Sequence, residues 1–194
     1  MQTVEQQYFT PEEYLEREAI AKDKSEYING QIIPMAGGST NHNRLMFNFG
    51  TQLNIAFDAH LDYEVFIADV RLWIPQCNVY TYPDIMIIFG EAEYHEENRT
   101  DTINNPQIII EILSPSTGGY DKDKKFKNSQ TIPSFQECIL VTQIQKHVDQ
   151  YVKVDHKQWS LCEYNEDDEK ITLQTVPIEI TLADLYKRVK LSDN

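Results

Sequence analysis

The sequence predicts an α/β fold in which helices flank a mixed central β-sheet, with an additional antiparallel hairpin region. Two short apolar runs, residues 83–89 and 107–113, are rich in isoleucine and bounded by turn residues, which is typical of buried central strands. Between them and the N-terminus, apolar residues recur every four positions from Asn41 to Asp58, which predicts an amphipathic helix. Mixed strands and helices of this kind indicate a sheet covered by helices.

The N-terminal part begins with a helix and a hairpin. Thr10 can cap a helix, Pro11 suits its first position and Glu13 completes a capping box. Asn29-Gly30 lies between apolar-rich flanks and predicts a tight hairpin turn, because both turn positions need a positive φ.

The remaining elements follow from the same signals. Residues 63–74 predict a strand that can contain a bend, and residues 90–106 predict a polar, solvated and mobile loop. A helix is expected over residues 121–130. Further strands are expected at 139–142, 147–154, 159–164 and 171–175, and a last helix at 182–189.

Length and composition are consistent with one domain over residues 1–194. Hydrophobic residues make up 41% of the chain, which is enough for a sizeable core, and charged residues make up 25%. The sequence has no run of about 18 apolar residues, so we expect no transmembrane helix. Residues 1–10 lack the basic and apolar regions of a signal peptide, so we expect a cytoplasmic protein with no membrane partner.

Three scattered cysteines, Cys77, Cys138 and Cys162, argue against a disulfide framework and against a zinc motif. We expect buried or inert thiols. The net charge of −14 disfavours strong non-specific binding to DNA, which usually needs a basic surface, but it leaves room for a divalent cation.

Two carboxylates are placed where charge is costly. Asp84 opens the first apolar strand, and Glu111 lies inside the second among aliphatic residues. A buried carboxylate needs a cation, a hydrogen-bonding backbone or a metal as a partner. On neighbouring strands the two would form an oxygen site suited to Mg²⁺ or Mn²⁺. The alternatives are that Asp84 is only a turn residue and that Glu111 faces solvent on an edge strand.

A cluster of lysines follows the second strand. Lys122, Lys124, Lys125 and Lys127 crowd the first turns of the predicted helix, where the helix dipole prefers negative charge. A broken local rule often marks a functional site, and the alternative is a solvated basic helix face.

These features resemble the PD-(D/E)XK nucleases, and in particular the Uma-two-type family of restriction endonucleases. The strict pattern places a lysine two residues after the glutamate, and here that position is Leu113. The family's signatures appear in order as Ser25–Gly30, Met35–Ser39 with His42-Asn43, Tyr82-Pro83-Asp84, Glu111–Thr117, Tyr120-Asp121 with Lys125-Phe126, Ile132–Glu137 and Leu182–Tyr186.

The resemblance implies a restriction-endonuclease-like core and a metal-dependent DNA endonuclease. Asp84 and Glu111 would hold Mg²⁺ or Mn²⁺, Lys125 would orient the attacking water or stabilise negative charge, and Glu26 would complete the acidic cluster. Substrate contacts are expected from His42, Lys122, Lys124 and Ser114. Because a nuclease that cuts both strands usually pairs two active sites, a homodimer is expected.

Two other functions remain open at this point. A catalytically silent binding or assembly protein would suit the acidic charge, and so would a hydrolase of a small phosphorylated molecule. His60, His95, His147 and His156 show no metal-binding spacing, and no glycine-rich nucleotide-binding loop is present.

Overall fold

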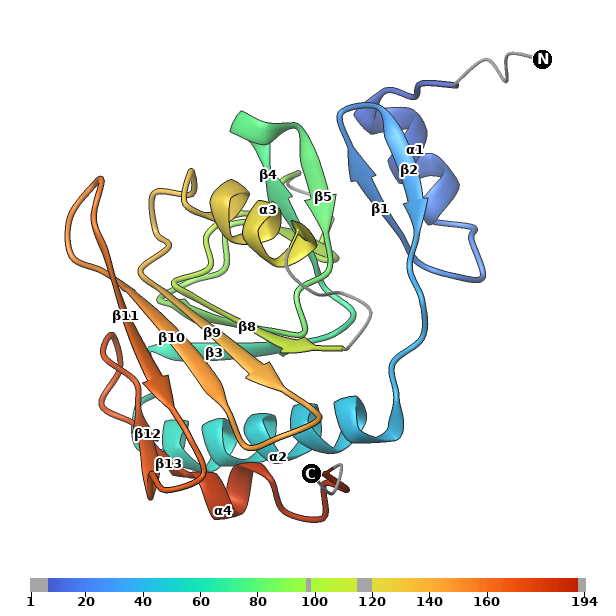
Figure 1. Ribbon diagram of the computed structural model, residues 1–194. Helices are drawn as coiled ribbons and strands as arrows, with labels where there is room; N and C mark the ends of the chain where they lie inside the picture. Colours follow the sequence, from blue (N-terminus) through green and yellow to red (C-terminus); the bar gives the residue numbers. More distant parts are fainter. Residues whose placement is uncertain (1–6, 97–98, 115–119, 192–194) are drawn as a thin grey trace.

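A six-stranded mixed sheet lies at the centre of the protein, in a computed structural model that describes residues 7–96, 99–114 and 120–191 (Figure 1). The strand order is β11-β10-β9-β8-β6-β3. Strands β8 and β9 are parallel, and the other neighbours are antiparallel. The bounds are β3 Tyr63–Ile67, β6 Ile85–Phe89, β8 Ile108–Leu113, β9 Glu137–Thr142, β10 Val148–Lys153 and β11 Trp159–Tyr164.

Helices cover both faces of this sheet, as predicted. Helix α2 (Thr40–Phe57) and the short α4 (Leu182–Leu185) pack on one face, and α3 (Tyr120–Ser129) lies over the other (Figure 1). Side chains of β8 alternate between two hydrophobic clusters: Ile110 packs with the α2 stripe, and Ile109 packs on the α3 side. Glu111 therefore belongs to the α3 face.

A second sheet, with the strand order β2-β1-β5-β4-β7, packs on the α3 side of the central sheet. Its β1–β2 hairpin turns at Asn29 and Gly30, whose φ values of 49° and 90° confirm the predicted turn. The capping box of α1 (Pro11–Glu18) is also confirmed. The bounds are β1 Ser25–Ile28, β2 Gln31–Pro34, β4 Arg71–Ile74, β5 Val79–Thr81 and β7 Thr102–Ile103, with a 3₁₀ turn at Pro75–Cys77.

Three expectations differ from the structure. The predicted strand 63–74 is two strands in different sheets, separated at Ala68, which has a φ of 62°. The loop 90–106 is not wholly solvated, because Thr102 and Ile103 are fully buried and pair in parallel with β4. The last helix ends at Leu185 instead of 189, and the chain turns at Arg188 with a φ of 62°.

The cysteines are free, but the expectation of buried thiols holds only in part. Cys138 is buried, Cys77 is half-buried and Cys162 is exposed. Strand β11 lies at the sheet edge, so its outer side chains face solvent. A small third sheet pairs β12 (Lys170–Thr172) with β13 (Glu179–Thr181). Among the described residues, no helix combines the length and apolar character needed to cross a bilayer.

Candidate active site

The two predicted carboxylates lie on adjacent strands and on the same face. The β6–β8 register pairs Ile85 with Ile110, so the next position along each strand brings Asp84 beside Glu111. Strand β8 is central, between β6 and β9, and the Glu111 side chain is only 17% exposed. The edge-strand interpretation of Glu111 is therefore wrong.

Both oxygens of Asp84 have partners. Oδ2 accepts a 2.7 Å hydrogen bond from the backbone N–H of Ile112, and Oδ1 lies 3.0 Å from Nε2 of His42. The hydrogen bond ties the residue before β6 to the neighbouring strand. Asp84 thus does more than form a turn, because its side chain is oriented by two other elements.

Lys125 reaches this face from α3. Its Nζ lies 2.9 Å from Oε1 of Glu26 and 3.9 Å from Oε1 of Glu111. Glu26, on β1, also accepts a short hydrogen bond from Oγ1 of Thr81 on β5. Four segments far apart in the sequence therefore bring Glu26, Asp84, Glu111 and Lys125 together.

Burial and neighbouring charges shift the ionisation of this group. Burial raises the pKa of Glu111 to about 7, and the charges of Asp84 and Glu26 add to the rise while Lys125 opposes it. The charge of Glu111, followed by that of Glu26, raises the pKa of Lys125 above its usual range. Lys125 is therefore a cation throughout the neutral range.

His42 approaches Asp84 from the first turn of α2. Its hydrogen bond to Asp84 raises the pKa of the imidazole, although burial opposes the rise. Ser39 caps the helix by accepting a 3.1 Å hydrogen bond from the N–H of His42. A Cβ added at Gly38 would lie 2.8 Å from Nδ1 of His42, so only glycine leaves room for the ring in this position.

Buried Gln143 connects the helix that carries His42 to the strand that carries Glu111. Its Oε1 accepts a short hydrogen bond from Oγ of Ser39, and its Nε2 donates a 3.2 Å hydrogen bond to the carbonyl of Leu113. Asn41 donates to the Gln143 carbonyl at 3.3 Å. The start of α2 is thus fixed against the end of β8.

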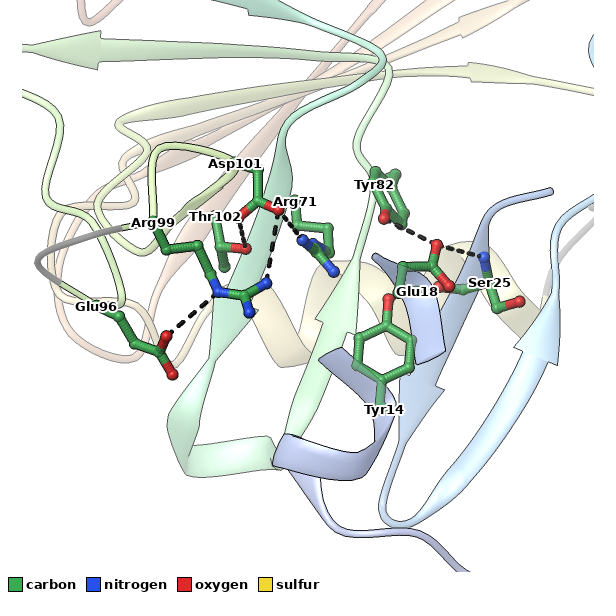
Figure 2. A network of polar contacts seen from close by, with 9 residues as sticks. All are labelled: Tyr14, Glu18, Ser25, Arg71, Tyr82, Glu96, Arg99, Asp101 and Thr102. Atoms are coloured by element: carbon green, nitrogen blue, oxygen red, sulfur yellow. Dashed lines mark hydrogen bonds and ion pairs between the residues drawn. The ribbon is translucent and has the colours of Figure 1, made fainter. Parts of the chain in front are cut away.

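A second polar network holds the segments that carry Glu26 and Asp84 (Figure 2). Oε1 of Glu18 accepts 2.9 Å hydrogen bonds from the N–H of Ser25 and from the hydroxyl of Tyr82. Ser25 precedes Glu26, and Tyr82 lies two residues before Asp84. Glu18 of α1 therefore links the backbones next to both acids.

Buried Arg71 lies beside the same network, between Asp101 and Tyr82 (Figure 2). Its guanidinium contacts Asp101 and lies 6.0 and 5.9 Å from the ring centroids of Tyr14 and Tyr82. This arrangement packs the second sheet against α1, which supports the Glu18 contacts.

The donor set suits a hard divalent cation. Three carboxylates lie beside one lysine and one histidine, and burial raises the pKa of Glu111, so its charged form is disfavoured unless a cation is bound. Mg²⁺ and Mn²⁺ prefer carboxylate oxygens and would offset this charge. Asp84 and Glu111, which are adjacent, are the residues that would hold the ion.

The residues predicted to contact the substrate are more dispersed than the carboxylates and Lys125. Lys124 is exposed on α3, and Ser114 directly follows β8 at the end near Gln143. The side chain of Lys122 lies outside the described residues. The sequence reasoning missed Thr81, Gln143 and Glu18, whose roles depend on pairing between distant segments. The local sequence feature near these contacts is the Gly37-Gly38 pair, which precedes the helix cap at Ser39.

Comparisons with known proteins identify the family and the fold. A sequence model of the Uma2 family, described as "Putative restriction endonuclease", matches residues 11–184. Two proteins of Synechocystis sp. (strain ATCC 27184 / PCC 6803 / Kazusa) are similar. The chain is 42% identical to sll1609 over 87% of its length and 94% of that protein, and 31% identical to slr1290 over 92% and 91%.

A solved structure has the same fold. It is the crystal structure of "a putative nuclease belonging to DUF820" from Anabaena variabilis ATCC 29413, with a TM-score of 0.75. The match covers 92% of this chain and 97% of that one at 21% sequence identity.

Proposed function

The chain belongs to the Uma2 family, and from this premise we propose that it is a metal-dependent phosphodiester hydrolase that acts as a DNA endonuclease. The observation that carries the proposal is the convergence of Asp84, Glu111 and Lys125, with Lys125 placed between Glu111 and Glu26. Both carboxylates are only 17% exposed, and bringing two like charges together in such a place costs stability unless cations compensate them, so this convergence favours a chemical role.

Each residue has a separate role in the proposed reaction. Asp84 and Glu111 hold Mg²⁺ or Mn²⁺, which when bound polarises the phosphate and lowers the pKa of a water molecule. Glu111 must be ionised to bind the cation, and its pKa of about 7 makes this step sensitive to pH. The hydrogen bond from Ile112 keeps Asp84 oriented toward Glu111.

Lys125 acts as a cation. Its raised pKa keeps the ammonium charged, so it stabilises negative charge that develops on the phosphate. Glu26 holds this ammonium at 2.9 Å and is itself held by Thr81. His42, at the first turn of α2, lies at the edge of the acidic group, where it can contact a substrate phosphate.

Cleavage assays test this function directly. We expect plasmid DNA to be cut in the presence of Mg²⁺ or Mn²⁺ and not in EDTA, while RNA and small phosphodiesters are poor substrates. Asp84→Asn and Glu111→Gln should both abolish cleavage, and Asp123→Asn on the exposed part of α3 is the matched control. Equal cleavage by the wild type and by both site variants would contradict the proposal.

We also propose that the protein is a homodimer that uses the apolar groove between α2 and the edge strand β3. The groove has a volume of about 330 Å³ and is lined by Phe47, Thr51, Ile55 and Ile67, among other uncharged residues. Two copies that each carry a charge of −14 repel one another over most of their surface. An interface between two copies therefore has to avoid charged residues, and this face meets that condition because its lining is uncharged.

A further inference from the structure

A second group of potential metal ligands lies on the sheet outside the acidic site. His147, Asp149 and Glu163 each place a ligand atom within 4.8 Å of the others. Asp149 follows His147 by two residues, and Glu163 is its direct partner on β11. Alternate residues of a strand and direct cross-strand partners share a face, so all three side chains point to the same side.

Both ring nitrogens of His147 have polar partners. Its Nδ1 lies 2.9 Å from Oδ1 of Asn165, and its Nε2 lies 2.8 Å from Oδ1 of Asp149. A neutral imidazole has a single N–H and can donate to only one of these two oxygens. If Nδ1 donates to Asn165, then Nε2 turns its lone pair toward the side of Asp149, which is the tautomer that a metal-binding imidazole uses.

We propose that His147, Asp149 and Glu163 bind a divalent transition-metal ion of the Zn²⁺ class. One imidazole nitrogen and two carboxylates form a donor set that such ions prefer over Mg²⁺. The contact with Asn165 orients the ring from its far side, as the outer partner of a metal-binding histidine does. Glu163 is exposed, so its side chain can rotate to complete bonds of about 2.0–2.2 Å.

This ion would be separate from the catalytic one. The strand register runs from Glu111 to Leu140 and from Leu140 to Asp149, which is two strand spacings, or roughly 10 Å. Paired catalytic metals lie only about 3.5–4 Å apart. The ion would instead clip the edge strand β11 to β10 and stabilise that end of the sheet.

The binding of Zn²⁺, measured by calorimetry, and of Co²⁺, measured by its absorption spectrum, tests the proposal on the full chain. In a protein carrying Asp84→Asn and Glu111→Gln, we expect one Zn²⁺ site to remain and to raise the melting temperature. His147→Ala added to that protein should remove both the site and the rise. Neither readout depends on nuclease activity, so the proposed function can fail without affecting this test.

Two further variants complete the design. His156→Ala removes an exposed histidine beside Asp155, in the turn between β10 and β11, and should leave Zn²⁺ binding unchanged. Glu163→Gln changes only an exposed residue of the edge strand, so it should fold normally and bind Zn²⁺ more weakly. Absence of Zn²⁺ binding in the Asp84→Asn and Glu111→Gln double variant would overturn the proposal. Zn²⁺ binding that stays unchanged after His147→Ala and after Glu163→Gln would overturn it as well.

Discussion

The backbone N–H of Ile112 donates a 2.7 Å hydrogen bond to Oδ2 of Asp84, which fixes the carboxylate against the strand that carries Glu111. The orientation of Asp84 depends on this bond, whereas its ability to bind a cation depends on its charge, so substitutions can change the two properties separately. An asparagine side chain can still accept the bond through its carbonyl oxygen, whereas an alanine cannot.

The first prediction uses this separation. Asp84→Asn should keep the fold and the melting temperature in EDTA but lose most of the stabilisation that Mn²⁺ gives to the wild type, because ligand binding to the folded state raises stability. Asp84→Ala should in addition cost about 1–3 kcal/mol, since a buried N–H loses its acceptor. Thermal melts with and without Mn²⁺ measure both effects. An unchanged Mn²⁺ response in Asp84→Asn would remove Asp84 from the metal ligands.

The second prediction concerns pH and Glu111. Its pKa is about 7 in the folded protein, against 4.5 for an exposed glutamate, so between these values the folded state binds more protons than the unfolded state. Without metal, stability should therefore fall as the pH rises from 4.5 to 7 and become level above that. The loss attributable to Glu111 is at most on the order of 3 kcal/mol.

Glu111→Gln tests this directly, because glutamine cannot ionise. The difference in stability between pH 5 and pH 8, measured by urea unfolding in EDTA, should be smaller in the variant than in the wild type. Saturating Mn²⁺ should also reduce the difference in the wild type, since the cation stabilises the ionised carboxylate. Identical pH profiles for variant and wild type would show that Glu111 does not titrate in this range.

The third prediction concerns the lysines of α3. Lys125→Ala should lower kcat about 10²–10³-fold with little change in KM, because its charge acts mainly on the transition state. Lys124 is exposed on the same helix, so its replacement should leave kcat nearly unchanged. If Lys122 and Lys124 contact the phosphate backbone, their replacement should weaken binding and flatten its salt dependence. Equal and small effects at Lys122, Lys124 and Lys125 would refute a special role for Lys125.

Much of the central sheet could be predicted from the sequence. The isoleucine runs of β6 and β8 and the stripe of α2 have strong periodicity, and they meet in one hydrophobic cluster. The second sheet could not be predicted in full, because β5 and β7 have only three and two residues. Such short strands have no periodicity of their own and depend on pairing with β4.

The candidate site, too, could be predicted from the sequence only in part. Asp84 and Glu111 were found because a charge inside an apolar strand is costly wherever the strand lies. The supporting contacts of Gln143 and Glu18 join distant segments, so no local pattern indicates them. The metal-binding role that we propose for His147 could not be predicted either, because Glu163 is brought to it by cross-strand pairing and not by sequence spacing.

The fourth prediction tests Gln143 as a positioning residue for His42. Gln143→Met keeps the side-chain volume but removes the hydrogen bonds to Ser39 and to Leu113. We expect a loss of about 1–3 kcal/mol in stability, because a buried carbonyl loses its donor. Displacement of α2 should also lower the raised pKa of His42, which NMR titration of the imidazole detects. If the pKa of His42 in Gln143→Met is as high as in the wild type, the positioning role is contradicted.

The last prediction concerns the groove between α2 and β3. Phe47 is 72% exposed although it is large and apolar, and it lines the groove with Ile55 and Ile67. If a second copy of the chain covers this face, Phe47→Glu introduces an unpaired charge into the interface and should shift the protein to monomers in sedimentation experiments. Leu61, which is 89% exposed and outside the groove, provides the control, since Leu61→Glu adds the same charge elsewhere. The fold should remain intact in both variants, because both residues are at the surface. A monomeric wild type, or a dimer unaffected by Phe47→Glu, would rule out this face as the dimer interface while leaving the acidic site untouched.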